Sequence, residues 1–206
     1  MAKKMKYVLY VSGDDAHFRD YSQNPCLKTY PVMPPVVAKG IMETIYWHKN
    51  CEWKITKIIN VNEPDYEDTY FTGFVNKNKW KHGRLVKTFI TNPAYVIEAE
   101  MSFIDEQKEI DHLKEKSSHC SVDIYKKADN IIRRRIKKQS TIKPVTLGLS
   151  TCHCEYKLID PDHNIKSNMK GNFEITLPVK QLYKKGKMIG VEMNIFNIVD
   201  GVLTYE

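Results

Sequence analysis

Two clusters of basic side chains are the chemically most informative feature of this sequence. Cations at repeated spacing can neutralise successive phosphates of a nucleic acid, and flat rings can stack on unpaired bases. The first cluster, between residues 126 and 143, contains the single acid Asp129, and the second is interleaved with Trp80 and His82. The basic members are Lys126, Lys127, Arg133, Arg134, Arg135, Lys137, Lys138 and Lys143 in the first, and Lys77, Lys79, Lys81, Arg84 and Lys87 in the second.

The overall balance of charge favours an anionic partner. The 206-residue chain has 32 Lys and Arg against 25 Asp and Glu, which gives a net charge of +7 at pH 7. Many basic proteins bind no nucleic acid, so charge alone leaves a solvated basic surface as an equal alternative. The concentration of the cations in two short segments favours nucleic-acid binding over that alternative.

The segment Cys152-His153-Cys154 raises the question of a metal site. Its spacing differs from the Cys-x-x-Cys pattern of zinc sites, and downstream only His163 could add a ligand. In a strand the two cysteines would share one face, which is typical of core residues. No carboxylates stand at the spacing of a metal nuclease, and no glycine-rich phosphate loop opens at Gly13. We therefore expect no cofactor and no metal.

The elements that must position the basic clusters are strands mixed with two helices. Pro34 and Pro35 predict the start of the first helix, because proline suits a first turn. The second helix is expected at 122–138, after a charged connection. Strands are expected at 6–12, 53–61, 94–104, 145–148, 152–159, 172–179 and 188–197, with a hairpin insertion at 65–92. The apolar stripe of the first helix comprises Val37, Gly40, Ile41, Thr44, Ile45 and His48.

This order of elements predicts an α+β protein. Strand, helix, strand, hairpin, strand, helix, strand is compatible with a ferredoxin-like unit of the kind found in many RNA-binding domains. We expect a ferredoxin-like domain with a basic hairpin insertion at residues 1–143. A small antiparallel β domain is expected at 144–206.

Four segments resemble one known family. Val32–Trp47, with the sequence VMPPVVAKGIMETIYW, resembles the first-helix signature of RAMP-type CRISPR proteins of the Cas5 family, in the Dvulg subtype of type I-C systems. Gly13–Phe18 and Ala94–Ala99 resemble the loop after the family's first strand and a later strand. The last segment comprises Lys126–Ala128, Ile132–Arg135 and Leu147-Gly148.

The resemblance implies a function and a set of partners. Such proteins bind CRISPR repeat RNA, and in type I-C systems they also cut the precursor at the base of the repeat hairpin. They stay on the 5′ handle of the guide RNA as a Cascade subunit, beside the backbone and large subunits, and meet target DNA through the complex. The alternative is a structural RNA-binding subunit without catalysis. A general RNA-binding protein outside CRISPR is a third hypothesis.

The resemblance also implies a catalytic site for metal-independent cleavage. A base must remove the ribose 2′-OH proton, a cation must stabilise the phosphate, and an acid must protonate the leaving 5′-oxygen. The family's tyrosine and lysine match Tyr46 and Lys127, but its histidine matches Ala128. His17 is the preferred substitute for the missing histidine. His48 is the second candidate, because on a continuous helix a residue two positions after Tyr46 would point away from it.

Each of these assignments has a structural alternative. Tyr46 would be an ordinary packed aromatic residue without the family match, and Lys127 is equally interpreted as one solvated cation among many. Neighbouring residues diverge by about 100° around a helix, so Arg133, Arg134 and Arg135 cannot all face RNA. The predicted RNA-binding residues are Lys39, Lys79, Trp80, Arg84, Lys126, Arg133, Arg134, Lys137 and Lys138.

The sequence favours a cytoplasmic protein without membrane contact. No apolar run approaches the ~18 residues of a spanning helix, and the apolar run at Tyr7–Val11 is too short for a signal peptide. The five cysteines are scattered and fit no disulfide framework.

Overall fold

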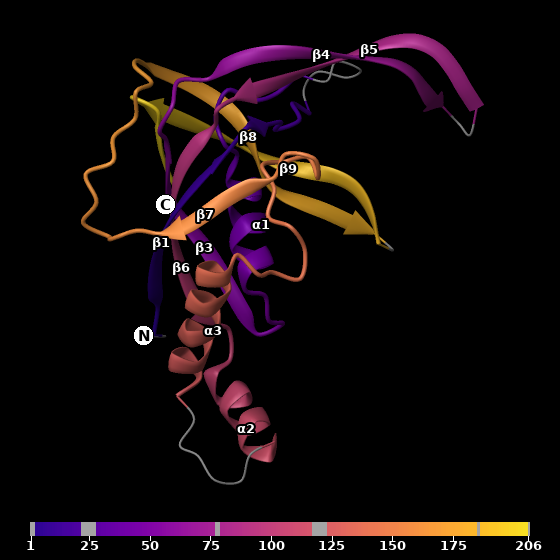
Figure 1. The fold of residues 1–206 in the computed structure, drawn as a ribbon. Coiled ribbons are helices and arrows are strands. Elements are labelled where there is room, and N and C mark those ends of the chain that lie inside the picture. Colours follow the sequence, from indigo (N-terminus) through magenta and orange to yellow (C-terminus); the bar gives the residue numbers. More distant parts are fainter. Residues whose placement is uncertain (1–2, 22–27, 77–78, 117–122, 185, 206) are drawn as a thin grey trace.

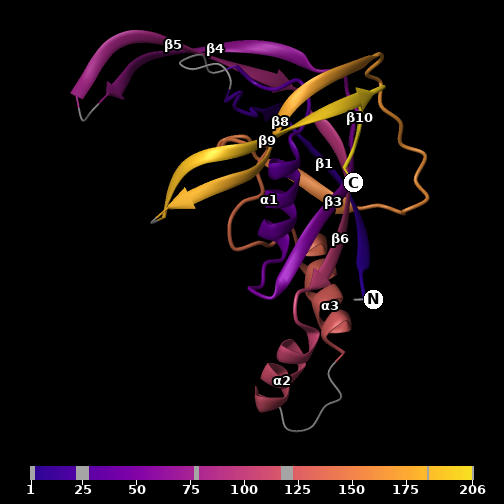
Figure 2. The same cartoon turned by 180° about the vertical axis from the view of Figure 1, so that it is seen from behind.

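Figures 1 and 2 show the protein as a computed structural model, which describes residues 3–21, 28–76, 79–116, 123–184 and 186–205. A seven-stranded antiparallel sheet forms its centre, in the order β7-β1-β6-β3-β10-β9-β8. The strands of this sheet are β1 (Met5–Gly13), β3 (Cys51–Asn60), β6 (Ala94–Phe103), β7 (Cys154–Leu158), β8 (Asn172–Lys184), β9 (Lys187–Val199) and β10 (Val202–Thr204).

Two helices connect strands of this sheet and cover one of its faces. The helix α1 (Pro35–Ile45) connects β1 to β3, and α3 (Ile124–Lys138) lies between β6 and β7. The four strands β7-β1-β6-β3 and these helices therefore follow a β-α-β-β-α-β order. The α+β class expected from the sequence is confirmed. The boundary at residue 143 stays a prediction, and β7, which lies beyond it, pairs with β1 in the same sheet.

Alternation along the strands decides which face the helices cover. Tyr7, Leu9 and Val11 point toward the helices and belong to the main core together with Trp53 and Ile97. Their neighbours on β1 point to the opposite face, because side chains alternate along a strand. There a smaller cluster of Val8, Ile59 and Val96 packs against side chains that include Ile159 and Ile165.

Two prolines define the start of the first helix, and apolar residues form its buried side. Pro35 stands at its first position, where a missing N–H costs nothing, and the carbonyl of Pro34 accepts from Val37 and Ala38. Its buried residues are Pro35, Ala38, Ile41, Met42 and Ile45. The predicted stripe was therefore wrong in part: Met42 is buried, and His48 lies beyond the end of the helix.

A second sheet holds the predicted insertion. It consists of β2 (Asp15–Ala16), β5 (Lys79–Thr91) and β4 (Asp65–Asn76), in the order β2-β5-β4. The long β4–β5 hairpin extends from one end of the molecule, whereas α3 lies toward the other end, where α2 is outermost in both views (Figures 1 and 2). The basic helix α3 and the hairpin therefore lie far apart in the molecule.

Three local predictions differ from the structure. The charged connection contains a helix, α2 (Glu106–Lys116), which the sequence analysis missed because its apolar periodicity is weak. Residues 145–148 contain only an isolated bridge between Thr146 and His153 instead of a strand. The short strand β10 was also missed, since three residues carry too little periodicity to be recognised.

Candidate nucleic-acid interface

The helix α3 displays the first basic cluster because its ends and its apolar side are firmly held. The carboxylate of Asp123 caps it by accepting from the backbone N–H groups of Tyr125 and Lys126, both at 3.0 Å. Gln139 ends it in the left-handed conformation, with φ of 49°. The buried side consists of Ile124, Tyr125, Ala128, Ile132 and Ile136.

The opposite side of α3 is a basic face. It comprises six exposed residues, of which Arg133 is paired with Asp129 at 2.8 Å. Asp129 also accepts a hydrogen bond from the hydroxyl of Tyr7 at 3.0 Å. Burial, followed by this hydrogen bond, raises the pKa of Tyr7. The other five make no ion pair with any described residue. The basic face of α3 consists of Lys126, Lys127, Arg133, Arg134, Lys137 and Lys138.

This basic face divides into two flanks. A rotation of about 100° per residue places Lys127, Arg134 and Lys138 on one flank, and the remaining three members on the other. The guanidinium of Arg135 donates to the carbonyl of Ile45 at 2.7 Å, so the Lys127 flank is the one nearer the end of α1.

An exposed tryptophan stands at that end of α1. Tyr46 leaves the helix with extended backbone angles, while its N–H still donates to Met42 and its carbonyl accepts from the indole of Trp53 at 2.8 Å. The next residue, Trp47, is 67% exposed. A large flat ring in solvent suits stacking on an unpaired base.

Tyr46 is half-buried at the same place. Burial, followed by the nearby Cys51 and Glu109, raises its pKa to about 12, while Arg135 opposes this shift. The hydroxyl is therefore protonated at neutral pH, so Tyr46 can donate a hydrogen bond or a proton but is a poor base.

His48 lies in the turn after α1 and contacts the helix α2. Its Nδ1 is 3.5 Å from Oε2 of Glu109 and 3.4 Å from the N–H of Asn50. Glu109 is only 8% exposed. Its carboxylate also acts electrostatically on Tyr46, so Tyr46, His48 and Glu109 share one neighbourhood. A continuous helix would turn His48 away from Tyr46, but α1 ends at Ile45, and Glu109 belongs to α2, a helix that the sequence pattern did not predict.

The structure does not bring His17 to Tyr46. His17 is 2% exposed, its Nδ1 donates to the carbonyl of Thr88 at 2.8 Å, and burial lowers its pKa. His17 follows Gly13, the last residue of β1. Tyr46 lies near the other end of this strand, because its carbonyl accepts a hydrogen bond from Trp53. Trp53 pairs with Met101, which in turn pairs with Met5 at the start of β1. That length of strand corresponds to roughly 25 Å.

Lys127 and Ala128, the other residues that the resemblance matches to catalytic positions, differ in their exposure. Lys127 is exposed and makes no hydrogen bond to Tyr46. Ala128 is 1% exposed and packs in the main core. A histidine at position 128 would therefore enter the core, so substitution there cannot simply restore a group that meets RNA.

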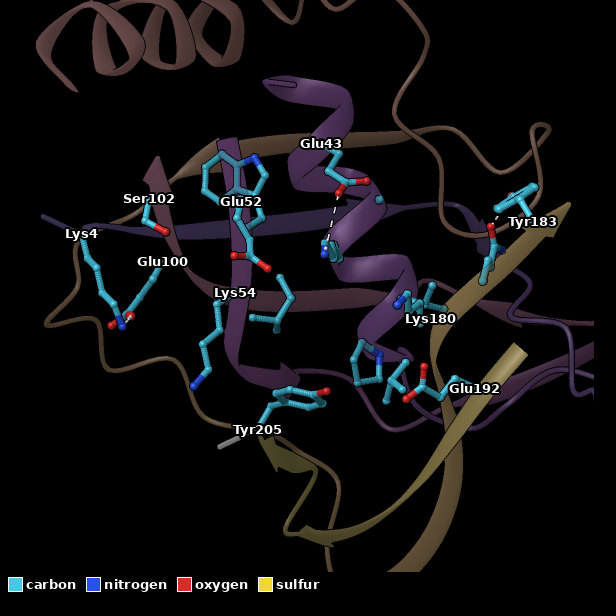
Figure 3. Close-up of a pocket in the computed structure, with 18 residues that line it drawn as sticks. Lys4, Glu43, Glu52, Lys54, Glu100, Ser102, Lys180, Tyr183, Glu192 and Tyr205 are labelled. Atoms are coloured by element: carbon cyan, nitrogen blue, oxygen red, sulfur yellow. Dashed lines mark hydrogen bonds and ion pairs between the residues drawn. The ribbon is translucent and has the colours of Figure 1, made fainter. Parts of the chain in front are cut away.

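Lys39 lies in a separate groove of about 760 Å³ beside α1, β3, β8 and β9 (Figure 3). Its amine is 4.0 Å from the carboxylate of Glu43, and Lys4 pairs with Glu100 at 3.0 Å. We call this region the mixed-charge groove, because its lining includes Lys4, Lys39, Lys54, Lys180, Glu43, Glu52, Glu100 and Glu192.

The remaining predicted RNA-binding residues, Lys79, Trp80 and Arg84, belong to β5. Their side chains lie outside the described part of the structure. Their strand pairs with β4 in the register Lys79–Asn76, Trp80–Val75 and Arg84–Thr72.

One family model matches more than half of this chain. The model of a family of CRISPR-associated proteins, Cas5, matches residues 7–161. The chain belongs to the Cas5 family. The match includes α1, α2, α3 and the β4–β5 hairpin of this Cas5 protein, and it ends before β8, β9 and β10. A search of curated proteins finds no match.

Solved structures share the fold of this Cas5 protein. A crystal structure of a CRISPR-associated protein has 16% sequence identity and a TM-score of 0.75, over 100% of this chain and 94% of that one. A functionally uncharacterized protein, SMU1763c from Streptococcus mutans, has 15% identity and a TM-score of 0.71, over 100% and 95%. The likeness supports the fold as a whole, including the strands beyond residue 161.

The described residues of this Cas5 protein place no group of three His, Cys, Asp or Glu side chains where it could hold a metal ion. Cys152 is buried, and burial raises the pKa of Cys154 to about 12, which disfavours the thiolate that a metal would need. None of the helices in the described ranges is long and apolar enough to cross a membrane.

Proposed function

We propose that this Cas5 protein binds CRISPR repeat RNA as the 5′-handle subunit of a type I-C Cascade complex. The observation that carries the proposal is the basic face of α3. Five of its six cations make no ion pair with a described residue, and the exposed Trp47 follows two positions after Ile45, whose carbonyl accepts from Arg135 of α3. Unpaired cations gain most from phosphate, since their release of counterions is not offset by a lost ion pair.

The proposal includes partners. Repeat RNA lies on α3 and the end of α1, and the backbone and large subunits of Cascade contact other surfaces. The complex reaches target DNA through its guide RNA. Family membership supports this assignment, and so does the placement of Lys127, Arg134 and Lys138 on one flank.

Binding is tested with a hairpin RNA transcribed from the CRISPR repeat of the same genome. We expect log Kd to rise linearly with log salt concentration, at about 0.7 per phosphate contact in single-stranded RNA. Affinity independent of salt would contradict binding through the basic face. If the protein does not co-purify with the other Cascade proteins, the assignment to the complex is contradicted.

Metal-independent cleavage of the precursor RNA is a second candidate function of the same protein. Tyr46, with its protonated hydroxyl, and the neighbouring Arg135 and Glu109 favour it. The test is incubation of the repeat RNA in EDTA, followed by analysis of the ends. A 2′,3′-cyclic phosphate supports it, whereas cleavage that EDTA abolishes and magnesium restores contradicts it.

A further inference from the structure

A histidine and a buried carboxylate next to Tyr46 form an arrangement that the family's catalytic positions do not include. His48 follows the end of α1, and Glu109 belongs to α2. The two side chains approach within 3.5 Å, although 61 positions separate them in the sequence. Neither Lys127 nor position 128 takes part in this contact.

The burial of Glu109 points to a role beyond surface charge. A carboxylate with 8% residue exposure is costly to bury, and burial is tolerated when a hydrogen-bonding or charged partner compensates it. The imidazole of His48 is its only ion-pair partner among the described residues. His48 itself keeps about a third of its side chain in solvent (32%), so the imidazole that contacts Glu109 is still partly accessible.

The contacts of Nδ1 define which nitrogen is free. Nδ1 must be protonated to pair with Glu109 and unprotonated to accept from Asn50. The contact with the carboxylate is charge-assisted and therefore the stronger of the two. With the proton on Nδ1, Nε2 carries a lone pair and has no hydrogen bond to a described residue. A carboxylate that holds Nδ1–H while Nε2 acts as a base is the arrangement of catalytic triads.

The surroundings supply the other requirements of RNA cleavage. Tyr46 shares the electrostatic neighbourhood of Glu109 and keeps its proton at neutral pH. Arg135 is fixed by its bond to Ile45 at 2.7 Å and places a cation at this end of α1. The Lys127 flank of the basic face lies beside it.

We propose that His48, oriented by Glu109, is the general base for RNA cleavage at the end of α1, a role that rests on the proposed RNA-binding function. Nε2 takes the proton of the ribose 2′-hydroxyl as the bond from the 2′-oxygen to phosphorus forms. The bond from phosphorus to the 5′-oxygen breaks, and the leaving 5′-oxygen takes a proton from the hydroxyl of Tyr46. Water then returns a proton to Tyr46 and removes the one on His48, which restores the site.

The test compares single-turnover cleavage and equilibrium binding of the same repeat hairpin RNA, both in EDTA. His48→Ala lowers the cleavage rate by about 10²-fold with little change in affinity, because it removes one proton-transfer group. Added imidazole restores part of the rate in His48→Ala, which a purely structural role of His48 would not allow. Glu109→Gln, which keeps the shape of the side chain, gives a smaller loss.

The matched control is His153→Ala, which removes an exposed imidazole far along the chain from α1. It leaves the rate unchanged. Circular dichroism and thermal unfolding of His48→Ala and Glu109→Gln verify that both variants still fold. Cleavage that persists in His48→Ala overturns the proposal, as does a loss that imidazole does not restore in a folded variant.

Two results for the wild type separate this inference from the function on which it rests. RNA that binds but is never cut overturns the role of His48 and leaves the handle-binding function intact. RNA that does not bind overturns the handle-binding function itself.

Discussion

The basic face of α3 and the mixed-charge groove both carry several lysines, yet they differ in what those lysines can do. In the groove, Lys4 and Lys39 have carboxylates within 4.0 Å, and further acids line the same walls (Figure 3). On α3 the only acid, Asp129, is occupied by Arg133 and by the hydroxyl of Tyr7. We therefore expect the position of the neighbouring acids, more than the number of cations, to determine which surface binds phosphate.

The largest expected effect comes from reversing charge on the Lys127 flank. Arg134→Glu with Lys138→Glu weakens binding of the repeat RNA by on the order of 10²-fold at low salt, because two phosphate contacts become repulsive. Fluorescence anisotropy with labelled RNA measures it. Lys54→Glu with Lys180→Glu in the groove makes the same change in net charge and has little effect. Equal losses of RNA affinity in the two double variants would contradict the proposed difference between the basic face of α3 and the mixed-charge groove.

Removal of the exposed ring tests whether the interface includes stacking. Trp47→Ala lowers affinity by about 10-fold, since stacking of a base on an aromatic ring contributes about 1–3 kcal/mol. Trp47→Phe retains most of the affinity, and Tyr183→Ala, which removes an exposed ring from the groove, has no effect. The same titration measures all three variants. An unchanged affinity in Trp47→Ala would restrict the interface to phosphate contacts.

Neutralising acids of the mixed-charge groove tests whether these acids prevent the groove from binding RNA. Glu52→Gln with Glu192→Gln removes two of the carboxylates that face Lys54 and Lys180. If these acids prevent RNA binding, the variant gains weak, salt-sensitive affinity for any RNA. The gain is no more than about threefold at low salt. A gain specific to the repeat RNA would instead assign the groove to the handle-binding surface.

The smallest effect on RNA affinity is expected for His17, which lies away from both regions. Burial lowers its pKa below the ordinary value of 6.5, so the unfolded chain binds a proton more readily than the folded one. Stability is therefore lost as the pH falls through the ordinary pKa toward the lowered pKa of the folded state, and His17→Gln, which can still donate to Thr88, reduces this loss. Thermal unfolding at several pH values measures it. Weaker RNA binding by this folded variant would contradict a structural role.

Much of the fold was predictable because it rests on local periodicity. Alternation along β1, β3 and β6 and the apolar side of α3 repeat at intervals of two or of three to four residues, which a sequence reveals directly. The candidate site was less accessible, as the histidines illustrate. His17 was preferred and is buried about 25 Å of strand away from Tyr46. His48 was placed on a helix that in fact ends at Ile45.

The sequence by itself determined the α+β class, the basic side of α3, the β4–β5 hairpin and membership of the Cas5 family, since each depends on residues close together in the chain. The sequence did not reveal that Glu100 lies beside Lys4, that Ala128 is buried, or that Glu109 reaches His48 from α2. These facts depend on contacts between distant segments. Such contacts follow from how the helices pack on the sheet, and no spacing within a single segment encodes them.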